Sequence, residues 1–120
     1  MTVYVVQSPM RRSPTSGELE FMHDLTPARV YGELSILLPS GPVLIDPEPA
    51  IRTLRDKLKD FTDLDSLLCM GDPVAIAAAA SIVSDVNRGV VPLLVWDRTS
   101  KLYNRIRVDI CKSRTHQPQE

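Results

Sequence analysis

The most strongly patterned run of apolar positions in the chain covers residues 65–96. Residues 66–70 are short and almost wholly apolar, which is typical of a buried strand. The next apolar run, which extends to about residue 86, predicts a helix, and residues 90–96 predict a second buried strand. This order predicts a strand–helix–strand unit with parallel strands, around which the core can form.

The helix of this unit has clear start and stop signals. Gly71 allows a tight turn, Asp72 is a good N-cap and Pro73 suits the first helical position. Between residues 74 and 83 only one side chain, a serine, is polar. A helix that is apolar on nearly every side is buried, so we expect water to be excluded from it all round. Where the sheet leaves part of it uncovered, a second copy of the chain would cover it in a homodimer.

The rest of the chain supplies further strands and one amphipathic helix. Apolar and β-branched runs predict strands over residues 2–7, 29–38 and 43–45, the last two joined as a hairpin. Over residues 46–61 apolar side chains recur every three or four positions, which predicts a helix lying on one face of a sheet. We therefore predict an α/β fold: a small Rossmann-like mixed sheet of about five or six strands, with two main helices and a C-terminal β-hairpin.

We expect residues 1–111 to form a single α/β domain. Residues 8–28 are rich in proline, serine and threonine and show no sustained period, so we interpret them as a long surface loop. Residues 102–111 alternate regularly between apolar and polar and predict the last strand of the hairpin, with one face exposed to water. Residues 112–120 are polar throughout and predict a disordered tail.

Composition and charge exclude several classes of protein. The chain is 43% apolar and 24% charged, which is ordinary for a soluble globular protein, and no run approaches the ~20 apolar residues of a membrane span. Its two cysteines, Cys69 and Cys111, are too few for a disulfide framework and indicate a reducing, cytoplasmic compartment. The net charge of −1 gives no general attraction for nucleic acid, although residues 98–120 carry six basic and only two acidic side chains.

The turn at Gly71 and Asp72 is a first candidate site. A helix N-terminus that follows a buried strand presents free amides and partial positive charge, which bind phosphate. Ligands of open α/β sheets bind beyond the carboxyl ends of the strands, where this turn is expected. However, the turn lacks both a G-x-G-x-x-G pattern and a Walker lysine, and Asp72 would itself occupy the amides. We therefore favour a capping role over phosphate binding.

Three carboxylates, Asp46, Asp72 and Asp97, each follow a predicted strand. If those strands are parallel, the carboxylates reach one edge of the sheet and could hold Mg²⁺ for phosphoryl transfer or nuclease chemistry. Each also has a local explanation as a helix-start or turn residue, which we favour. We accordingly predict no cofactor, and Mg²⁺ belongs only to the enzymatic alternative.

The last predicted strand displays Tyr103, Arg105 and Arg107 on one face and Ile106 and Val108 on the other. An aromatic side chain beside arginines is the combination that binds single-stranded nucleic acid and other macromolecules. The competing interpretation is a solvated outer face, on which charge prevents pairing between strands of different molecules. We favour the solvated face, because only one aromatic side chain is present and the net charge is negative.

The chain resembles small uncharacterised bacteriophage proteins that share a GDPVAI…LLVWDR core. The resemblance rests on LLCMGDPVAIAAAASIVSDVNRG, VVPLLVWDR, RVYGELSILLPSG and AIRTLRDKLKDF, and covers most of residues 1–111. It implies a virus-encoded protein in the cytoplasm of an infected bacterial host. It implies no activity, cofactor or catalytic residue.

These features together favour a non-enzymatic phage accessory protein that binds a host or phage macromolecule. We expect a protein partner, a homodimer and no membrane contact, with residues 8–28 and the Tyr103, Arg105 and Arg107 face as contact surfaces. One alternative is a nucleotide- or phosphate-binding protein, with Mg-dependent phosphoryl transfer or nuclease chemistry at the Gly71-Asp72 helix start. A further alternative is single-stranded nucleic-acid binding by the basic C-terminal hairpin.

Overall fold

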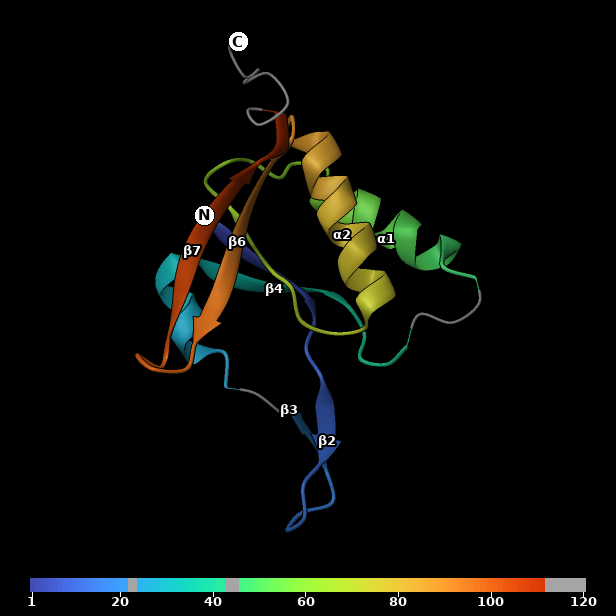
Figure 1. Cartoon of the computed structure of the whole chain (residues 1–120). Helices are drawn as coiled ribbons and strands as arrows, with labels where there is room; N and C mark the ends of the chain where they lie inside the picture. Colours follow the sequence, from blue (N-terminus) through green and yellow to red (C-terminus); the bar gives the residue numbers. More distant parts are fainter. Residues whose placement is uncertain (22–23, 43–45, 112–120) are drawn as a thin grey trace.

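The computed structural model describes residues 1–21, 24–42 and 46–111. Within them the chain forms a five-stranded sheet, a separate two-stranded sheet, two α-helices and one 3₁₀ helix (Figure 1). In chain order the elements are β1 (Thr2–Gln7), β2 (Met10–Arg12), β3 (Leu19–Phe21), η1 (Thr26–Tyr31), β4 (Glu33–Leu38), α1 (Glu48–Leu58), β5 (Ser66–Leu68), α2 (Pro73–Val86), β6 (Val90–Asp97) and β7 (Leu102–Asp109).

The five-stranded sheet has the order β4-β1-β5-β6-β7. Neighbours among the first four strands are parallel, and β7 is antiparallel to β6. The chain passes from β1 to β4 on one side and then crosses to β5 on the other side, so the strand order reverses at β1. The mixed sheet, the two main helices and the antiparallel C-terminal pair confirm the predicted α/β fold class.

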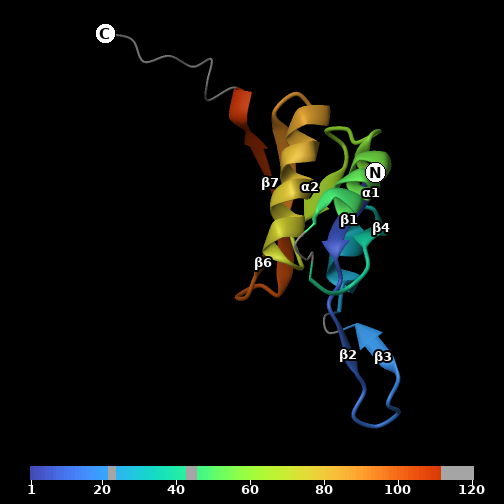
Figure 2. The ribbon, with the colours of Figure 1, turned by 90° about the vertical axis from the view of Figure 1, so that its right-hand side faces the viewer.

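Helices cover the two faces of the sheet unequally (Figure 2). On one face, α1 and α2 pack on alternate strand residues such as Val6 and Leu67, and bury Leu54 and Val83 of their own. On the opposite face the short η1 packs on the intervening strand residues, of which Val5 is one. The larger core therefore lies between the sheet and the pair of α-helices.

One side of α2 is exposed, contrary to the sequence prediction. Ala75, Ala79 and Val83 are buried, but Val74 is 49% exposed and Ala77 also faces solvent. Because α2 lies in the outer layer of the fold, the sheet and α1 cover only its inner side. The prediction that this helix is shielded on all sides is wrong for the isolated chain.

Residues 8–28 contain regular structure where the sequence predicted a loop. β2 and β3 pair antiparallel, with Met10 opposite Phe21 and Arg12 opposite Leu19, and η1 follows. Strands of three residues are too short to show a period, which explains the error. Residues 22–23 lie outside the described residues.

The second predicted strand begins later than expected. Pro27 lies in the first turn of η1, which continues to Tyr31, so β4 starts only at Glu33. β4 pairs with β1 in parallel. Its predicted hairpin partner, residues 43–45, and the predicted tail, residues 112–120, lie outside the described residues.

Candidate functional site

Gln7 joins the loops after β4 and β5 at the carboxyl edge of the sheet, beside the point where the strand order reverses. Its buried side chain donates from Nε2 to the carbonyls of Pro39 (2.9 Å) and Gly41 (2.6 Å). Its Oε1 accepts a hydrogen bond from the Asp72 N–H (2.6 Å), and its own N–H donates to the Met70 carbonyl (2.9 Å). Gln7 therefore occupies the position at which folds of this strand order commonly bind a ligand.

The turn at Gly71 and Asp72 is formed as predicted, but the amides of Asp72 and Val74 already have acceptors. Asp72 is the N-cap of α2, and its Oδ2 accepts from the Val74 N–H at 3.0 Å. The Asp72 N–H itself donates to Gln7. A pocket of about 410 Å³ lies beside the turn and is lined partly by Gln7 and Gly71. Phosphate binding here stays a prediction, and it would require these acceptors to be displaced.

The three aspartates of the predicted metal site each accept a hydrogen bond from a nearby amide. The carboxylate of Asp46 accepts from the Glu48 N–H (3.1 Å), and that of Asp97 accepts from the Thr99 N–H (2.9 Å). The bond from Thr99 is the main cause that lowers the pKa of Asp97. In the described part of the chain, no group of three or more His, Cys, Asp or Glu side chains could hold a metal ion. Mg²⁺ binding by Asp46, Asp72 and Asp97 stays a prediction.

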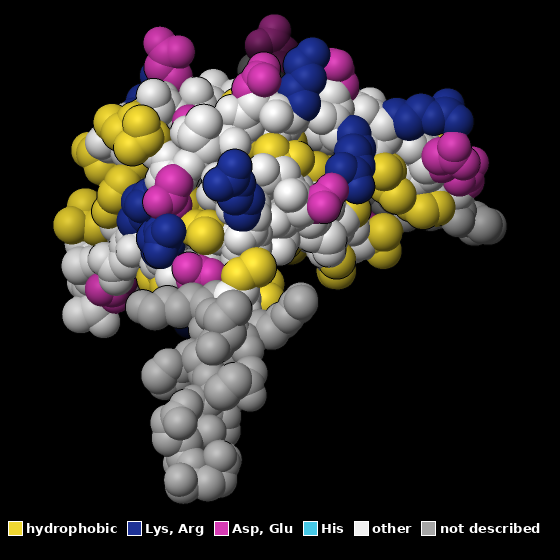
Figure 3. Space-filling model, turned by 90° about the horizontal axis from the view of Figure 1, so that it is seen from above, with side chains coloured by type: hydrophobic (Ala, Val, Ile, Leu, Met, Phe, Trp, Pro, Cys, Tyr) yellow, Lys and Arg dark blue, Asp and Glu magenta, His cyan; other side chains and the backbone are white. Residues whose placement is uncertain are grey.

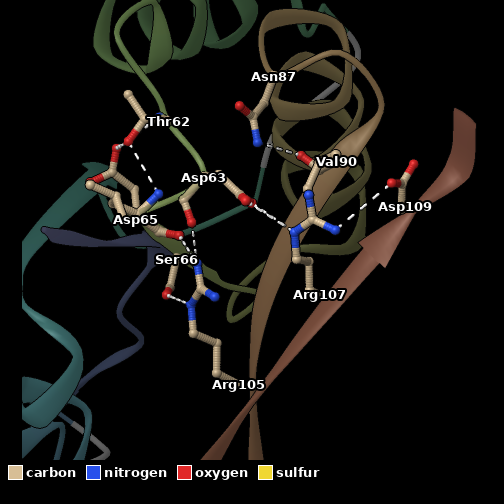
Figure 4. Close-up of polar contacts among 10 residues, drawn as sticks. Thr62, Asp63, Asp65, Ser66, Asn87, Val90, Arg105, Arg107 and Asp109 are labelled. Atoms are coloured by element: carbon tan, nitrogen blue, oxygen red, sulfur yellow. Dashed lines mark hydrogen bonds and ion pairs between the residues drawn. The ribbon is translucent and has the colours of Figure 1, made fainter. Parts of the chain in front are cut away.

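Arg105 and Arg107 reach from β7 to the loop that precedes β5 (Figure 4). Arg105 donates from Nε to the Ser66 hydroxyl (3.0 Å) and from Nη2 to the carbonyls of Asp63 (2.5 Å) and Asp65 (2.9 Å). The Nε of Arg107 lies 3.0 and 3.1 Å from the two carboxylate oxygens of Asp63. Hydrogen bonding to Asp63 also raises the pKa of Arg107.

The predicted basic face is thus brought together but bound to the protein's own loop. Asp63 offsets the charge of Arg107, and Arg105 uses its donors on Ser66 and main-chain carbonyls. On the side of the molecule seen in Figure 3, basic and acidic side chains are interspersed and do not form one basic patch. Binding of nucleic acid or another macromolecule by these arginines stays a prediction.

Both faces of β7 are partly exposed, and on the face that the sequence predicts to be solvated only Tyr103 is buried. Tyr103 is buried, 6% exposed, and meets Trp96 edge-on with ring centroids 5.0 Å apart. On the opposite face Ile106 and Val108 are 48% and 36% exposed. The interpretation of the Tyr103 side as a solvated face is wrong at this residue, because η1 packs there. On the other face α2 covers β6 but leaves β7 open.

A cleft of about 720 Å³ opens at the carboxyl edge of β5 and β6. Pairing between these strands ends at Leu68 opposite Leu94, whereas β6 continues to Asp97. The shorter strand therefore leaves a gap beside the end of the longer one. The lining of this carboxyl-edge cleft is mainly apolar and includes Leu68, Met70, Leu94, Val95, Trp96 and Tyr103.

Two titratable groups of the carboxyl-edge cleft hold their protons more tightly than they would in water. Burial raises the pKa of the Tyr103 phenol, and the nearby Asp24 adds to the effect. Burial also raises the pKa of the Cys69 thiol, although this residue lies beyond β5 with part of its surface exposed. A protonated thiol is a poor nucleophile. Asp24 and Lys101 complete the lining with one charge of each sign.

The β2–β3 hairpin projects from the same edge of the sheet (Figures 1 and 2). Asp24, three residues beyond β3, lines the carboxyl-edge cleft, so the base of the hairpin adjoins it. The turn is held by the Ser13 N–H, which donates to the Glu18 carbonyl (2.7 Å), and by Arg12, which donates to the Gly17 carbonyl (2.8 Å). A two-stranded hairpin is at best marginally stable on its own, so this one depends on its attachment to the rest of the chain.

Sequence reasoning missed Val95 and Trp96 as surface residues. They were placed inside a buried strand, but they are 44% and 41% exposed. The error arises because β5 ends at Leu68, two residues before the predicted strand does. One signal was present: the chain's single tryptophan stands immediately before a turn, at the carboxyl end of its strand.

In the residues that the structure describes, no helix is both long enough and apolar enough to cross a bilayer.

Neither the curated proteins nor the solved structures gave a match to this chain. A family model for the phage Pam3 gp32-like protein matches residues 1–110, which include every strand and helix described above. This match confirms the resemblance to small phage proteins. The chain belongs to the phage Pam3 gp32-like protein family.

Proposed function

We propose that this phage protein is a non-enzymatic accessory protein that binds another protein, of the phage or its host, by taking an apolar segment into the carboxyl-edge cleft. The observation that carries the proposal is the pair Val95 and Trp96, which stand partly exposed in a mainly apolar cleft of about 720 Å³. Concave apolar sites of this size with few polar groups are typical binding sites.

The chemistry of the cleft supports binding rather than turnover. Trp96, held by edge-on contact with the buried Tyr103, offers a rigid apolar surface, and tryptophan is enriched among the residues that dominate interface energies. The thiol of Cys69 and the phenol of Tyr103 both have raised pKa values, which suits neither for base or nucleophile chemistry near neutral pH.

The charges of the cleft and the adjoining hairpin support a peptide segment as the bound group. Asp24 and Lys101 are both exposed and of opposite sign, so they can pair with charged side chains that flank an apolar one. The β2–β3 hairpin would extend the contact beyond the cleft, which agrees with the expectation that residues 8–28 form a contact surface.

The test is selection of random peptides on the purified protein, followed by fluorescence titration with the enriched peptides. Because Trp96 is the chain's only tryptophan, its emission reports binding in the cleft. Replacing a central interface side chain typically costs about 2 kcal/mol, or roughly 30-fold in Kd, and we expect a loss of this order for Val95→Asp, read with a fluorescent label on the peptide.

The matched control is Val74→Asp, which introduces the same change at a similarly exposed valine of α2 outside the cleft lining. We expect it to leave the peptide Kd unchanged, since an acidic residue is also favourable in the first turn of a helix. Equal binding by wild type and Val95→Asp would overturn the proposal. A nucleotide that stabilised the protein by about 2.7 kcal/mol at a hundred times its Kd would instead support the phosphate-binding alternative.

A further inference from the structure

We infer that the free edge of β7 is a dimerisation edge, at which a second copy of this chain adds its own β7 in antiparallel register. The two sheets would then form one continuous sheet across a twofold axis. This surface is distinct from the carboxyl-edge cleft, and the inference does not depend on the proposed function.

The outer side of β7 presents backbone groups that another strand can pair with. Ile110 donates its N–H to the Gly89 carbonyl, so the even-numbered residues of β7 direct their backbone groups toward β6. The odd-numbered residues therefore direct theirs outward. The carbonyl of Tyr103 agrees with this, because it accepts a hydrogen bond from the Tyr31 hydroxyl (2.7 Å) on the far side from β6. Arg105 and Arg107 continue the outward row.

Among the described residues, no strand pairs with the outer side of β7, and two of the usual protections of such an edge are absent. Natural edges are kept apart by charged side chains, prolines or bulges. β7 contains no proline and pairs with β6 over all eight of its residues without a bulge. Its two arginines do not guard the edge, because their guanidinium groups lie back over the sheet on Asp63 and Ser66.

The open face of β7 adds an apolar stripe beside this edge. Ile106 and Val108 are partly exposed on the face that carries α2. A second copy related by a twofold axis perpendicular to the sheet places its own Ile106 and Val108 on the same face. The two stripes would then bury each other. Each Å² of apolar surface removed from water stabilises the dimer by about 25 cal/mol.

One register between the two β7 strands suits the side chains on both faces of the joined sheet. With Arg107 on the twofold axis, Ile106 lies opposite Val108 of the second copy, and Arg105 lies opposite Asp109 of the second copy. Apolar cross-strand pairs such as Ile106 with Val108 are stabilising. The two Arg107 side chains meet at the axis, but each already has its own Asp63 as counter-ion. A register centred on Ile106 would set Arg105 against Arg107 twice.

This self-complementarity is why a second copy, rather than an unrelated protein, is the occupant. Closed twofold contacts use one patch on both subunits, as β7 would here. It also differs from the homodimer expected through α2, whose outer side carries the ion pair of Asp85 with Arg55 of the neighbouring helix.

The test compares the mass of the full chain and its variants in solution by light scattering. We expect wild type at twice 13.4 kDa. Arg107→Pro removes an N–H that points away from β6 and breaks no hydrogen bond to β6. We therefore expect the variant to stay folded, as measured by circular dichroism, and its mass in solution to halve. Arg107→Ala also loses the Asp63 pair but keeps the N–H, and should stay dimeric. A monomeric wild type, or a folded dimeric Arg107→Pro, would overturn the inference.

Disulfide trapping tests the register of the two β7 strands separately. In a Cys69→Ser, Cys111→Ser background, Arg107→Cys places the same residue on both sides of the axis, about 5.5 Å apart between Cα atoms, which suits a disulfide. We expect rapid oxidation to a covalent dimer. Arg105→Cys faces Asp109 of the second copy and should oxidise far more slowly. Preferential trapping through Arg105→Cys would refute this register.

Discussion

Two independent constraints make residue 71 a glycine. Its φ of +123° lies in the region that side chains rarely adopt, and a Cβ there would overlap the side chain of Gln7. Gln7 cannot move aside without losing its bonds to Pro39, Gly41 and Asp72. The close approach of these two residues therefore holds the carboxyl edge of β1 against the start of α2.

We predict that Gly71→Ala destabilises the fold more than Gly41→Ala does. Both positions have a similar positive φ, +123° and +120°, but nothing lies within 4 Å of a Cβ at Gly41. Strain of about 1–3 kcal/mol is common to both, and only Gly71→Ala also displaces Gln7. Urea unfolding measures the difference, and equal losses in the two variants would contradict the role of Gln7.

These residues show where sequence reasoning works and where it fails at this scale. The cap at Asp72 was predictable because its bond to Val74 is local. Gln7 was not, because its partners Pro39 and Asp72 are 32 and 65 positions away. A glutamine at the end of a strand carries no local sign of such bonds.

Between elements, the contact of β7 with the loop before β5 depends mainly on Arg105. Its guanidinium donates to Ser66, which is almost fully buried, and to two main-chain carbonyls. The neighbouring Arg107 makes its ion pair with Asp63 in a half-exposed position. Partly buried hydrogen bonds to a charged group contribute more than exposed ion pairs, which water and salt weaken.

We predict that Arg105→Ala lowers the free energy of unfolding by about 1–3 kcal/mol, because it leaves acceptors around Ser66 unpaired. The matched variant Arg107→Ala removes the same side chain from the same strand and face, and should cost clearly less. Chemical denaturation of both proteins at one ionic strength, with equal m values, measures this. A larger loss in Arg107→Ala would show that the ion pair is the stronger contact.

The elements themselves were largely predictable, and their partners were not. Strand β6 and helix α2 followed from a long apolar pattern with clear boundary residues, such as Gly89. The β2–β3 hairpin and η1 were missed because their three to six residues form too short a pattern. Alternation along β7 was correctly predicted, but which face is exposed depends on where η1 and α2 happen to end.

For the whole molecule, the folded state shifts the proton affinity of two tyrosines. Burial is the main cause that raises the pKa of Tyr4, and Asp65 and Asp60 add to it. Burial likewise raises the pKa of Tyr103. A raised pKa means that the folded protein holds these protons more tightly than the unfolded chain, whose tyrosines titrate near pH 10 (about the ordinary value).

We therefore predict that stability falls as the pH rises through about 10, where unfolded tyrosines lose protons that the folded protein still holds. The contribution of these groups is complete below that pH. Urea unfolding across this range should show a shallower decline in Tyr4→Phe/Tyr103→Phe than in wild type. An unchanged slope in the double variant would exclude these tyrosines as its source.

The sequence by itself determined the α/β class, the parallel unit around α2 and the antiparallel end of the sheet, because each follows from local periodicity, capping and turn residues. The tertiary structure alone decided that β5 stops short of β6 to open a cleft at Trp96, that Arg105 and Arg107 fold back onto Asp63 and Ser66, and that no strand among the described residues pairs with the outer side of β7. These features depend on the relative lengths and packing of elements distant in the chain, and no local pattern of side chains encodes them.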